Sequence, residues 1–239
     1  MTTADKQTVA DFLDTTRDFL GGGYKSEKIL YNFDKPVQVL KRPALNVDNT
    51  QTADSLEKIT EEISVCRNCP LANGRKNTVP GEGVKNPVVL VIGEGPGADE
   101  DVQGRPFVGK AGQLLDKMLA AIDLSRTTNC FIANVVKCRP PNNRDPFPEE
   151  RAACSYFLHR QILLLKPKFI LLVGNIASQS ILKTTEPIGK IRGKFFDYQI
   201  DELTIPLIVT YHPSGILRRE EFKRPAWEDL KLLKSKIGN

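Results

Sequence analysis

The chain has 239 residues, of which 40% are hydrophobic, and its 34 Lys and Arg against 29 Asp and Glu give a formal net charge of +5. This apolar fraction suffices for a sizeable core and excludes a disordered protein. No apolar stretch is long enough to cross a bilayer, and the first residues lack the basic start and apolar core of a signal peptide. We therefore expect a cytoplasmic protein without a membrane segment.

The first 57 residues differ in composition from the rest. They hold seven Lys or Arg against nine Asp or Glu, whereas residues 58–239 hold 27 against 20, so the basic character belongs to the body of the chain. Apolar residues at helical spacing over 8–20, followed by three glycines, predict a short amphipathic helix, and the polar stretch after it predicts a linker. We predict two parts, an arm over 1–57 and a folded domain over 58–239.

Four of the five cysteines form a pattern typical of a metal centre. Cys66 and Cys69 are separated by two residues, and Cys138 and Cys154 by fifteen. In a reducing compartment, clustered cysteines bind metal more often than they form disulfides. A zinc ribbon would usually repeat the close pair, so the spacing favours an iron-sulfur cluster but leaves zinc open. Cys130 has no partner at a ligand spacing, and we expect an ordinary buried thiol.

From residue 87 onward, continuous apolar runs alternate with amphipathic stretches. We predict buried strands over 88–93, 130–136, 169–174 and 207–212, and helices over 112–122, 149–165, 176–182 and 226–237. Strands separated by helices form parallel sheets that are covered on both faces. The predicted fold class is α/β, a three-layer α-β-α arrangement around a central, mainly parallel sheet.

Polar or glycine-rich segments follow three of these strands. The first strand runs into GEGPGADED (93–101), the second carries Asn134 and ends near Cys138, and the fourth ends at His212 within TYHPSGILR (210–218). Because ligands bind beyond the carboxyl ends of parallel strands, we expect these segments to face one cleft. An amide inside an apolar run costs about 1 to 3 kcal/mol if it has no partner, so something polar must face Asn134.

Each motif alone has an ordinary structural interpretation. GEGPG fits neither a dinucleotide fingerprint nor a Walker loop, so by itself it is a tight turn. Phe107 is a residue type found more often in a core than on a binding surface. The carboxylate of Glu94 would satisfy turn amides, and Ile216 and Leu217 would pack under a surface loop. Only the combination of motifs is specific.

The order of the motifs resembles that of the family 4 uracil-DNA glycosylases, which are of the iron-sulfur type. The motifs are C-x2-C, GEGPGADED with GRPFVGKAGQLLD, NVVKCRPPNNRDP, the wide cysteine pair and YHPSGILR. The resemblance covers about residue 58 to the end. It implies a uracil-DNA glycosylase-like fold. It also implies an enzyme that flips uracil out of single-stranded or duplex DNA and hydrolyses its N-glycosidic bond, leaving an abasic site for base excision repair.

The resemblance further implies roles at the matching positions. Glu94 and Gly95 would line the uracil pocket, Phe107 would stack on the base, and Asn134 would read its polar edge. His212 would donate a hydrogen bond to O2, which makes His212 and Glu94 the expected catalytic residues. Cys66, Cys69, Cys138 and Cys154 would hold a [4Fe-4S] cluster.

Other positions carry looser expectations. We expect Glu100, in the loop over 99–101, to exclude the methyl group of thymine, Ile216 and Leu217 to wedge into the DNA, and Arg218 or Arg219 to hold a phosphate. Further loop residues would bind the DNA backbone, namely Arg75, Lys76, Lys110 and Arg144. The protein would act as a monomer on DNA containing uracil, and its arm would contact a replication or repair protein.

Three alternatives differ from this prediction. A subfamily that binds uracil very tightly has a KRRIH insert after the first motif, whereas PFVGKAGQLLD runs on here without one. A non-catalytic iron-sulfur protein that binds DNA would not need His212, Asn134 and Phe107 together. A zinc-stabilised nucleotide-binding module would be colourless and would ignore uracil in DNA.

Overall fold

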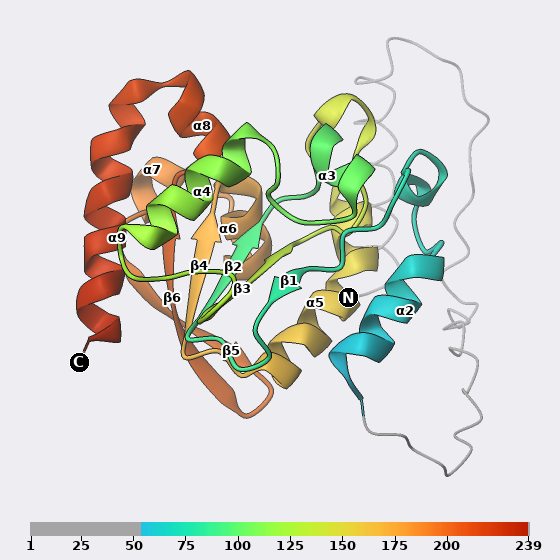
Figure 1. Ribbon diagram of the computed structural model, residues 1–239, viewed down its shortest axis with the longest axis horizontal. Coiled ribbons are helices and arrows are strands. Elements are labelled where there is room, and N and C mark those ends of the chain that lie inside the picture. The colour runs from blue at the N-terminus through green and yellow to red at the C-terminus, as the bar shows by residue number, and fades with distance from the viewer. Residues whose placement is uncertain (1–53, 239) are drawn as a thin grey trace, which may run out of the picture. The chain divides into compact units, whose positions relative to one another are not determined.

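Residues 54–238 are described by a computed structural model, and within them six strands form one sheet (Figure 1). Four strands run parallel: β2 (Val89–Gly93), β3 (Cys130–Asn134), β4 (Phe169–Val173) and β6 (Leu203–Thr210). The edge strands β1 (Glu82–Gly83) and β5 (Phe195–Ile200) are antiparallel to their neighbours, and the order is β1-β3-β2-β4-β6-β5. The helix predicted over 8–20 and the linker lie outside the described residues.

Helices cover both faces of the sheet, which explains why its central strands are continuously apolar. Val89 and Val91 of β2 pack in one cluster with α4 (Lys110–Ala120) and α9 (Lys223–Ile237). Leu90 and Ile92 pack on the other face with α5 (Pro148–Leu165), α6 (Asn175–Leu182) and α7 (Ile188–Ile191). Alternate side chains of one strand thus enter two cores. The predicted three-layer α/β fold is confirmed.

The strands and helices predicted from residue 87 onward are all present, with different ends. β6 ends at Thr210, because His212 begins the next helix, α8 (Pro213–Arg218), as its N-cap. The strand β5 was not predicted, because its residues alternate between half-buried and exposed at the sheet edge. It reaches β6 through a tight turn at Asp201, which has a φ of 48°. In residues 54–238, none of the helices has the length and apolar character needed to span a bilayer.

The helix α2 (Leu56–Val65) lies beside α5 (Figure 1). Ile59 and Ile63 pack against Phe157 of α5, and Arg160 of α5 forms ion pairs with Asp54 and Glu62. This packing positions two cysteines, since α2 ends at Cys66 and α5 carries Cys154. The division between arm and domain at residue 57 stays a prediction, because residues 1–53 lie outside the described part.

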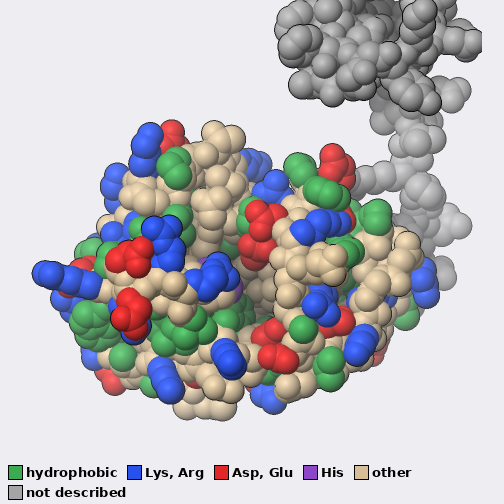
Figure 2. All heavy atoms as spheres, turned by 90° about the horizontal axis from the view of Figure 1, so that it is seen from above, with side chains coloured by type: hydrophobic (Ala, Val, Ile, Leu, Met, Phe, Trp, Pro, Cys, Tyr) green, Lys and Arg blue, Asp and Glu red, His purple; other side chains and the backbone are tan. Residues whose placement is uncertain are grey.

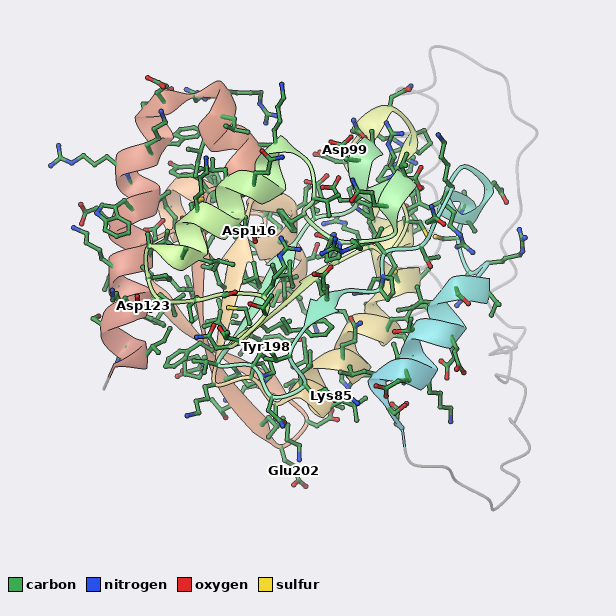
Figure 3. All side chains as sticks on the ribbon, viewed as in Figure 1. Lys85, Asp99, Asp116, Asp123, Tyr198 and Glu202 are labelled. Atoms are coloured by element: carbon green, nitrogen blue, oxygen red, sulfur yellow. The ribbon has the colours of Figure 1, made fainter. Side chains whose placement is uncertain are left out.

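The two ends of the sheet differ in what they carry. The carboxyl ends of the parallel strands lead into α3 (Ala98–Gln103), α8 and the loops around them, and Asp99 marks this end in Figure 3. Lys85 and Glu202 mark the opposite end (Figure 3). Residues at that opposite end can therefore serve as surface controls for substitutions near the carboxyl ends of the parallel strands.

Candidate functional site

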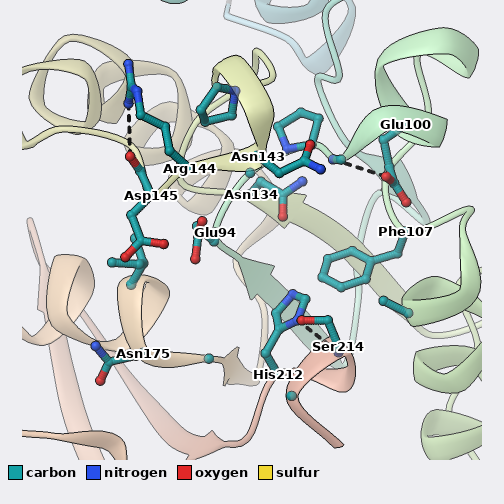
Figure 4. A pocket seen from close by; sticks show the side chains of 18 of the residues that line it. Glu94, Glu100, Phe107, Asn134, Asn143, Arg144, Asp145, Asn175, His212 and Ser214 are labelled. Atoms are coloured by element: carbon teal, nitrogen blue, oxygen red, sulfur yellow. Dashed lines mark hydrogen bonds between the residues drawn. The ribbon is translucent and has the colours of Figure 1, made fainter. Parts of the chain in front are cut away.

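A cleft of about 480 Å³ opens beyond the carboxyl ends of β2, β3 and β6 (Figure 4). Figure 2 shows this end of the molecule, where the surface is hollowed and both basic and acidic side chains lie around the hollow. All five residues predicted for the pocket line the cleft: Glu94, Gly95, Phe107, Asn134 and His212. The parallel sheet therefore brings together three segments that are far apart in the sequence.

Asn134 is the last residue of β3 and is only 1% exposed, yet its amide oxygen has no hydrogen-bond partner within residues 54–238. It pairs in the ladder with Gly93 of β2. A Cβ atom on Gly93 would lie 2.5 Å from the amide oxygen and 2.6 Å from the ring of Phe107, so only glycine fits there. A buried amide oxygen without a partner is costly, so a water molecule or a polar ligand must supply its donor from the cleft.

The loop that carries Phe107 is strained and firmly held. Phe107 has a φ of 52°, a conformation that costs a bulky residue about 1 to 3 kcal/mol. The guanidinium of Arg126 donates to the carbonyl oxygens of Pro106 and Phe107, at 2.9 Å each. Gly112 makes room for the same loop, since a Cβ atom there would lie 1.9 Å from the Phe107 carbonyl oxygen. The ring of Phe107 is thereby fixed in the cleft wall, 5.6 Å from the ring of His212.

His212 is held as a neutral ring with a defined tautomer. The main-chain N–H of Ser214 donates to Nδ1 at 3.1 Å, and the Ser214 hydroxyl lies 2.8 Å from the same nitrogen. Because a main-chain N–H can only donate, Nδ1 carries no proton and the proton of the neutral ring is on Nε2. Burial, with a smaller effect of Arg218, lowers the pKa of His212 to about 4. At neutral pH the ring therefore offers the cleft an uncharged N–H donor.

Glu94 follows β2 directly and lines the same cleft (Figure 4). Burial raises the pKa of Glu94 to about 7, and the nearby Asp145 adds to the rise while Arg151 opposes it. The carboxyl group therefore changes its charge near neutral pH. A carboxyl group with this pKa in a cleft has the property expected of a group that takes part in catalysis.

Glu100 lines the cleft and also holds the loop that carries Phe107 (Figure 4). One carboxylate oxygen accepts from the main-chain N–H groups of Val108 and Gly109, at 2.9 and 3.1 Å, and the other accepts from that of Gly97 at 3.1 Å. Since Glu100 also lines the cleft, the expectation that it blocks the thymine methyl stays a prediction. Because Gly97 has no side chain, only one half of a capping box forms at the start of α3, from Glu100 to the N–H of Gly97.

The residues at the rim of the cleft that were expected to contact DNA differ in their exposure and in their bonding partners. Ile216 is 3% exposed and packs inside, whereas Leu217 is 51% exposed, so only Leu217 is placed as a wedge would have to be. Arg218 lines the cleft, but Arg219 pairs with Glu221. Arg144 is held by both carboxylate oxygens of Glu150, at 2.7 and 2.8 Å. The prediction of Ile216 as a wedge is therefore wrong, because Ile216 is buried, whereas a backbone contact of Arg144, which also lines the cleft, stays a prediction.

The four predicted cysteine ligands line one small cavity between α2, the segment after β3, and α5: Cys66, Cys69, Cys138 and Cys154. Two N–H groups point at their sulfur atoms. Arg75 donates to the sulfur of Cys138 at 3.2 Å, and the main-chain N–H of Lys137 donates to that of Cys154 at 3.3 Å. Arg75 is thus committed to this centre rather than to DNA.

Burial raises the pKa of Cys138, and it raises the pKa of Cys154 to about 11. Thiols in such surroundings become thiolates when they bind a metal. In residues 54–238, no three side chains of His, Cys, Asp or Glu are grouped as ligands of a single ion would be. Cys130 lies away from this cavity as a buried thiol, and burial raises its pKa to about 12.

Comparisons with known proteins point to one family. The family model for the uracil DNA glycosylase superfamily matches residues 80–231. A type-4 uracil-DNA glycosylase of Pyrobaculum aerophilum is 44% identical over 73% of this chain and 91% of its own length, and one of Thermotoga maritima is 42% identical over 76% and 94%. A type-5 uracil-DNA glycosylase of Mycobacterium bovis is 30% identical over 68% of this chain and 74% of its own.

Proposed function

Since this chain belongs to the type-4 uracil-DNA glycosylases of the uracil DNA glycosylase superfamily, we propose that its cleft holds a flipped uracil and that five residues bind and release it there. The chain is a DNA glycosylase that removes uracil from DNA in base excision repair. One observation carries the proposal for the site. The unpaired buried amide oxygen of Asn134 and the neutral ring of His212 line the same cleft, and the ring of Phe107 lies in its wall 5.6 Å from the ring of His212.

Asn134 selects uracil by hydrogen bonding. Its amide donates to O4 and accepts from N3–H, and cytosine presents the opposite pattern on that edge. Cytosine would therefore leave buried polar groups unpaired, which costs about 1 to 3 kcal/mol for each group. Phe107 supplies a flat surface for stacking, which is worth about 1 to 3 kcal/mol for each base. The base leaves the DNA stack to reach this site.

His212 stabilises the leaving group. When the bond between C1′ of the sugar and N1 of uracil breaks, the electron pair stays on the base and negative charge develops on O2, while the sugar acquires cationic character. The Nε2–H of a neutral His212 donates to O2. It stabilises the negative charge without any change in the protonation of the ring. The carboxylate of Glu94 stabilises the sugar cation and orients the water whose oxygen becomes bonded to C1′. The proton that this water loses passes through solvent to the released uracil anion.

Replacing Asp145 should change the pH dependence of the reaction. The ionised form of Glu94 is the active one in this mechanism, so kcat should rise with pH through the pKa of Glu94, about 7. Asp145→Asn removes a neighbouring negative charge that raises this pKa, so the Glu94 carboxylate forms at lower pH. The part of the pH profile in which kcat rises, its rising limb, should therefore move to lower pH. The measurement is kcat on a single-stranded uracil oligonucleotide from pH 5 to pH 9, values chosen to bracket the limb.

Glu94→Gln is the matched control, because it cannot titrate and its profile should lack this limb. His212 does not produce the limb, because its pKa is lowered to about 4. A wild-type profile that is flat between pH 6 and 8, roughly one unit on each side of the limb, would show that the charge of Glu94 plays no part.

We propose that Cys66, Cys69, Cys138 and Cys154 hold a [4Fe-4S] cluster. All four thiols line one cavity between α2, the segment after β3 and α5. Their spacing, one close pair and one wide pair, favours a cluster over a zinc ribbon, which would usually repeat the close pair. When bound, the cluster would brace the segment between β3 and α5, since hydrolysis of a glycosidic bond needs no electrons.

Cys154→Ala should release iron and lower stability, and Cys130→Ala is the matched control. Loss of one ligand is expected to cost about 4 kcal/mol, which lowers the Tm by roughly 10 °C in a chain of this size. Cys130→Ala leaves the four ligands intact, should keep its iron, and should cost about 1 kcal/mol. Iron content, visible absorption and thermal unfolding of both variants are measured side by side. Equal iron in the two variants, or a colourless wild type with bound zinc, would contradict the cluster.

We further propose how the protein meets DNA and its surroundings. Leu217 enters the space that the flipped base leaves, and Arg218 holds an adjacent phosphate, because these are the exposed apolar side chain and the cleft-lining cation of α8. The protein acts as a monomer in the cytoplasm. Its first 57 residues contact a replication or repair protein through the amphipathic pattern over 8–20.

Cleavage of labelled oligonucleotides tests the function directly. Single-stranded and U:G duplex substrates are incubated with anaerobically purified protein, and abasic sites are revealed by alkali. We expect cleavage at uracil and none at thymine. Protein with a full iron-sulfur spectrum that leaves uracil intact would overturn the function and favour a protein that only binds DNA.

A further inference from the structure

Lys137 is a buried lysine that the reaction described above does not use. It is 1% exposed and is the largest of the fully buried side chains in residues 54–238. Lysine is among the residues least often buried, because its ammonium group loses its hydration. A lysine in this position therefore needs a reason in the bonds that it makes.

The ammonium group of Lys137 replaces a missing strand neighbour at the edge of the sheet. Its Nζ donates to the main-chain oxygen of Asn134 at 3.0 Å. The edge strand β1 pairs with β3 only at Phe131 and Ile132, so the ladder on that side stops before Asn134. A buried main-chain oxygen must find a donor elsewhere, and Lys137 supplies it.

The same ammonium group is anchored to a helix. It donates to the side-chain oxygen of Gln161 on α5 at 2.7 Å, and the amide nitrogen of Gln161 donates to the carbonyl oxygen of Pro80 at 2.8 Å. Gln161 is itself 2% exposed. The main-chain oxygen of Lys137 also accepts from Val79 at 2.8 Å. The last residue of β3 is thus tied through Lys137 to α5 and to the segment before β1.

We propose that Lys137 is a positioning residue that sets the place of Asn134 in the base pocket from the interior of the protein. The Asn134 side chain reaches the cleft, while its main-chain oxygen is held from behind by Lys137. A shift of about 1 Å in a binding group can lower a rate about 10²-fold. This inference deepens the function proposed above and depends on the role given to Asn134 there.

Lys137 also connects the base pocket with the cysteine centre. The main-chain N–H of Lys137 donates to the sulfur of Cys154, and the next residue is Cys138. One residue therefore contacts a cysteine ligand through its main chain and the base-reading strand through its side chain. Its substitution must be judged with the iron content known, so that loss of the cluster is not mistaken for a displaced Asn134.

Lys137→Met keeps the aliphatic side chain and removes the donor, and Gln161→Met removes the anchor but leaves the ammonium group on Asn134. We expect the inhibition constant for free uracil to rise about tenfold or more in Lys137→Met and less in Gln161→Met. Binding of DNA that already contains an abasic site should stay within about twofold, because that complex does not use Asn134. Iron per chain and the visible spectrum are measured on the same samples.

Leu233→Ala is the control for a general loss of stability, since Leu233 is fully buried on α9 in the opposite layer. It should lower the Tm while leaving inhibition by uracil unchanged. If Lys137→Met does not fold, Gln161→Met carries the test alone. The inference is overturned if the folded variant, Lys137→Met or Gln161→Met, has the wild-type inhibition constant for free uracil. It is also overturned if Leu233→Ala changes that constant by an equal amount. A wild type that free uracil does not inhibit would instead overturn the proposed pocket.

Discussion

His212→Ala is expected to lower kcat on uracil-containing DNA by about 10² to 10³-fold, the usual cost of losing one donor to a developing negative charge. The ring is neutral and its Nε2–H is fixed by the contact between Ser214 and Nδ1, so the substitution removes an oriented donor rather than a cation. The KM should change little, because O2 carries its charge mainly in the transition state. Single-turnover cleavage of a uracil oligonucleotide measures the effect.

His159→Ala is the matched control, because His159 is the other histidine of the chain and lies half-exposed beside Asp201. It should cleave like the wild type. A His212→Ala variant with wild-type kcat would show that O2 is stabilised by another group. A rise in KM together with the fall in kcat would indicate that His212 contributes ground-state binding as well.

Asn134→Asp is expected to lower activity on uracil by about 10³-fold, because the carboxylate has only acceptors where O4 of uracil needs a donor. The side chain is buried and its amide oxygen has no partner in the described part of the chain, so the mismatch cannot be relieved by solvent. A protonated carboxyl group would match cytosine, so weak cleavage at cytosine is expected to appear at low pH. Rates on matched uracil and cytosine oligonucleotides measure the change.

Asn175→Asp provides the matched control, since Asn175 also lines the cleft but is exposed. It adds the same negative charge near the DNA without touching the proposed readout. Comparable losses in the two variants would mean that charge repulsion of DNA, and not base reading, explains the result. Retained uracil activity in Asn134→Asp would remove Asn134 from the role proposed for it.

Much of the fold could be predicted because its signals are local. The runs over 88–93 and 169–174 are continuously apolar, which marks strands buried on both faces, and the helices between them follow from apolar spacing. Strand β5 was missed because an edge strand is only half buried. The rule that ligands bind at the carboxyl ends of parallel strands was enough to bring Glu94, Asn134 and His212 to one cleft.

The sequence by itself determined the fold class and the motif order, because these depend on patterns within single segments, and the resemblance of those motifs to a known family supplied the five pocket residues. Only the tertiary structure decided that Ile216 is buried while Leu217 is exposed, and that Arg75 bonds to Cys138. It also decided that Lys137 lies behind Asn134. Burial and hydrogen-bond partners depend on which distant segments fold against a residue, and no local pattern carries that information.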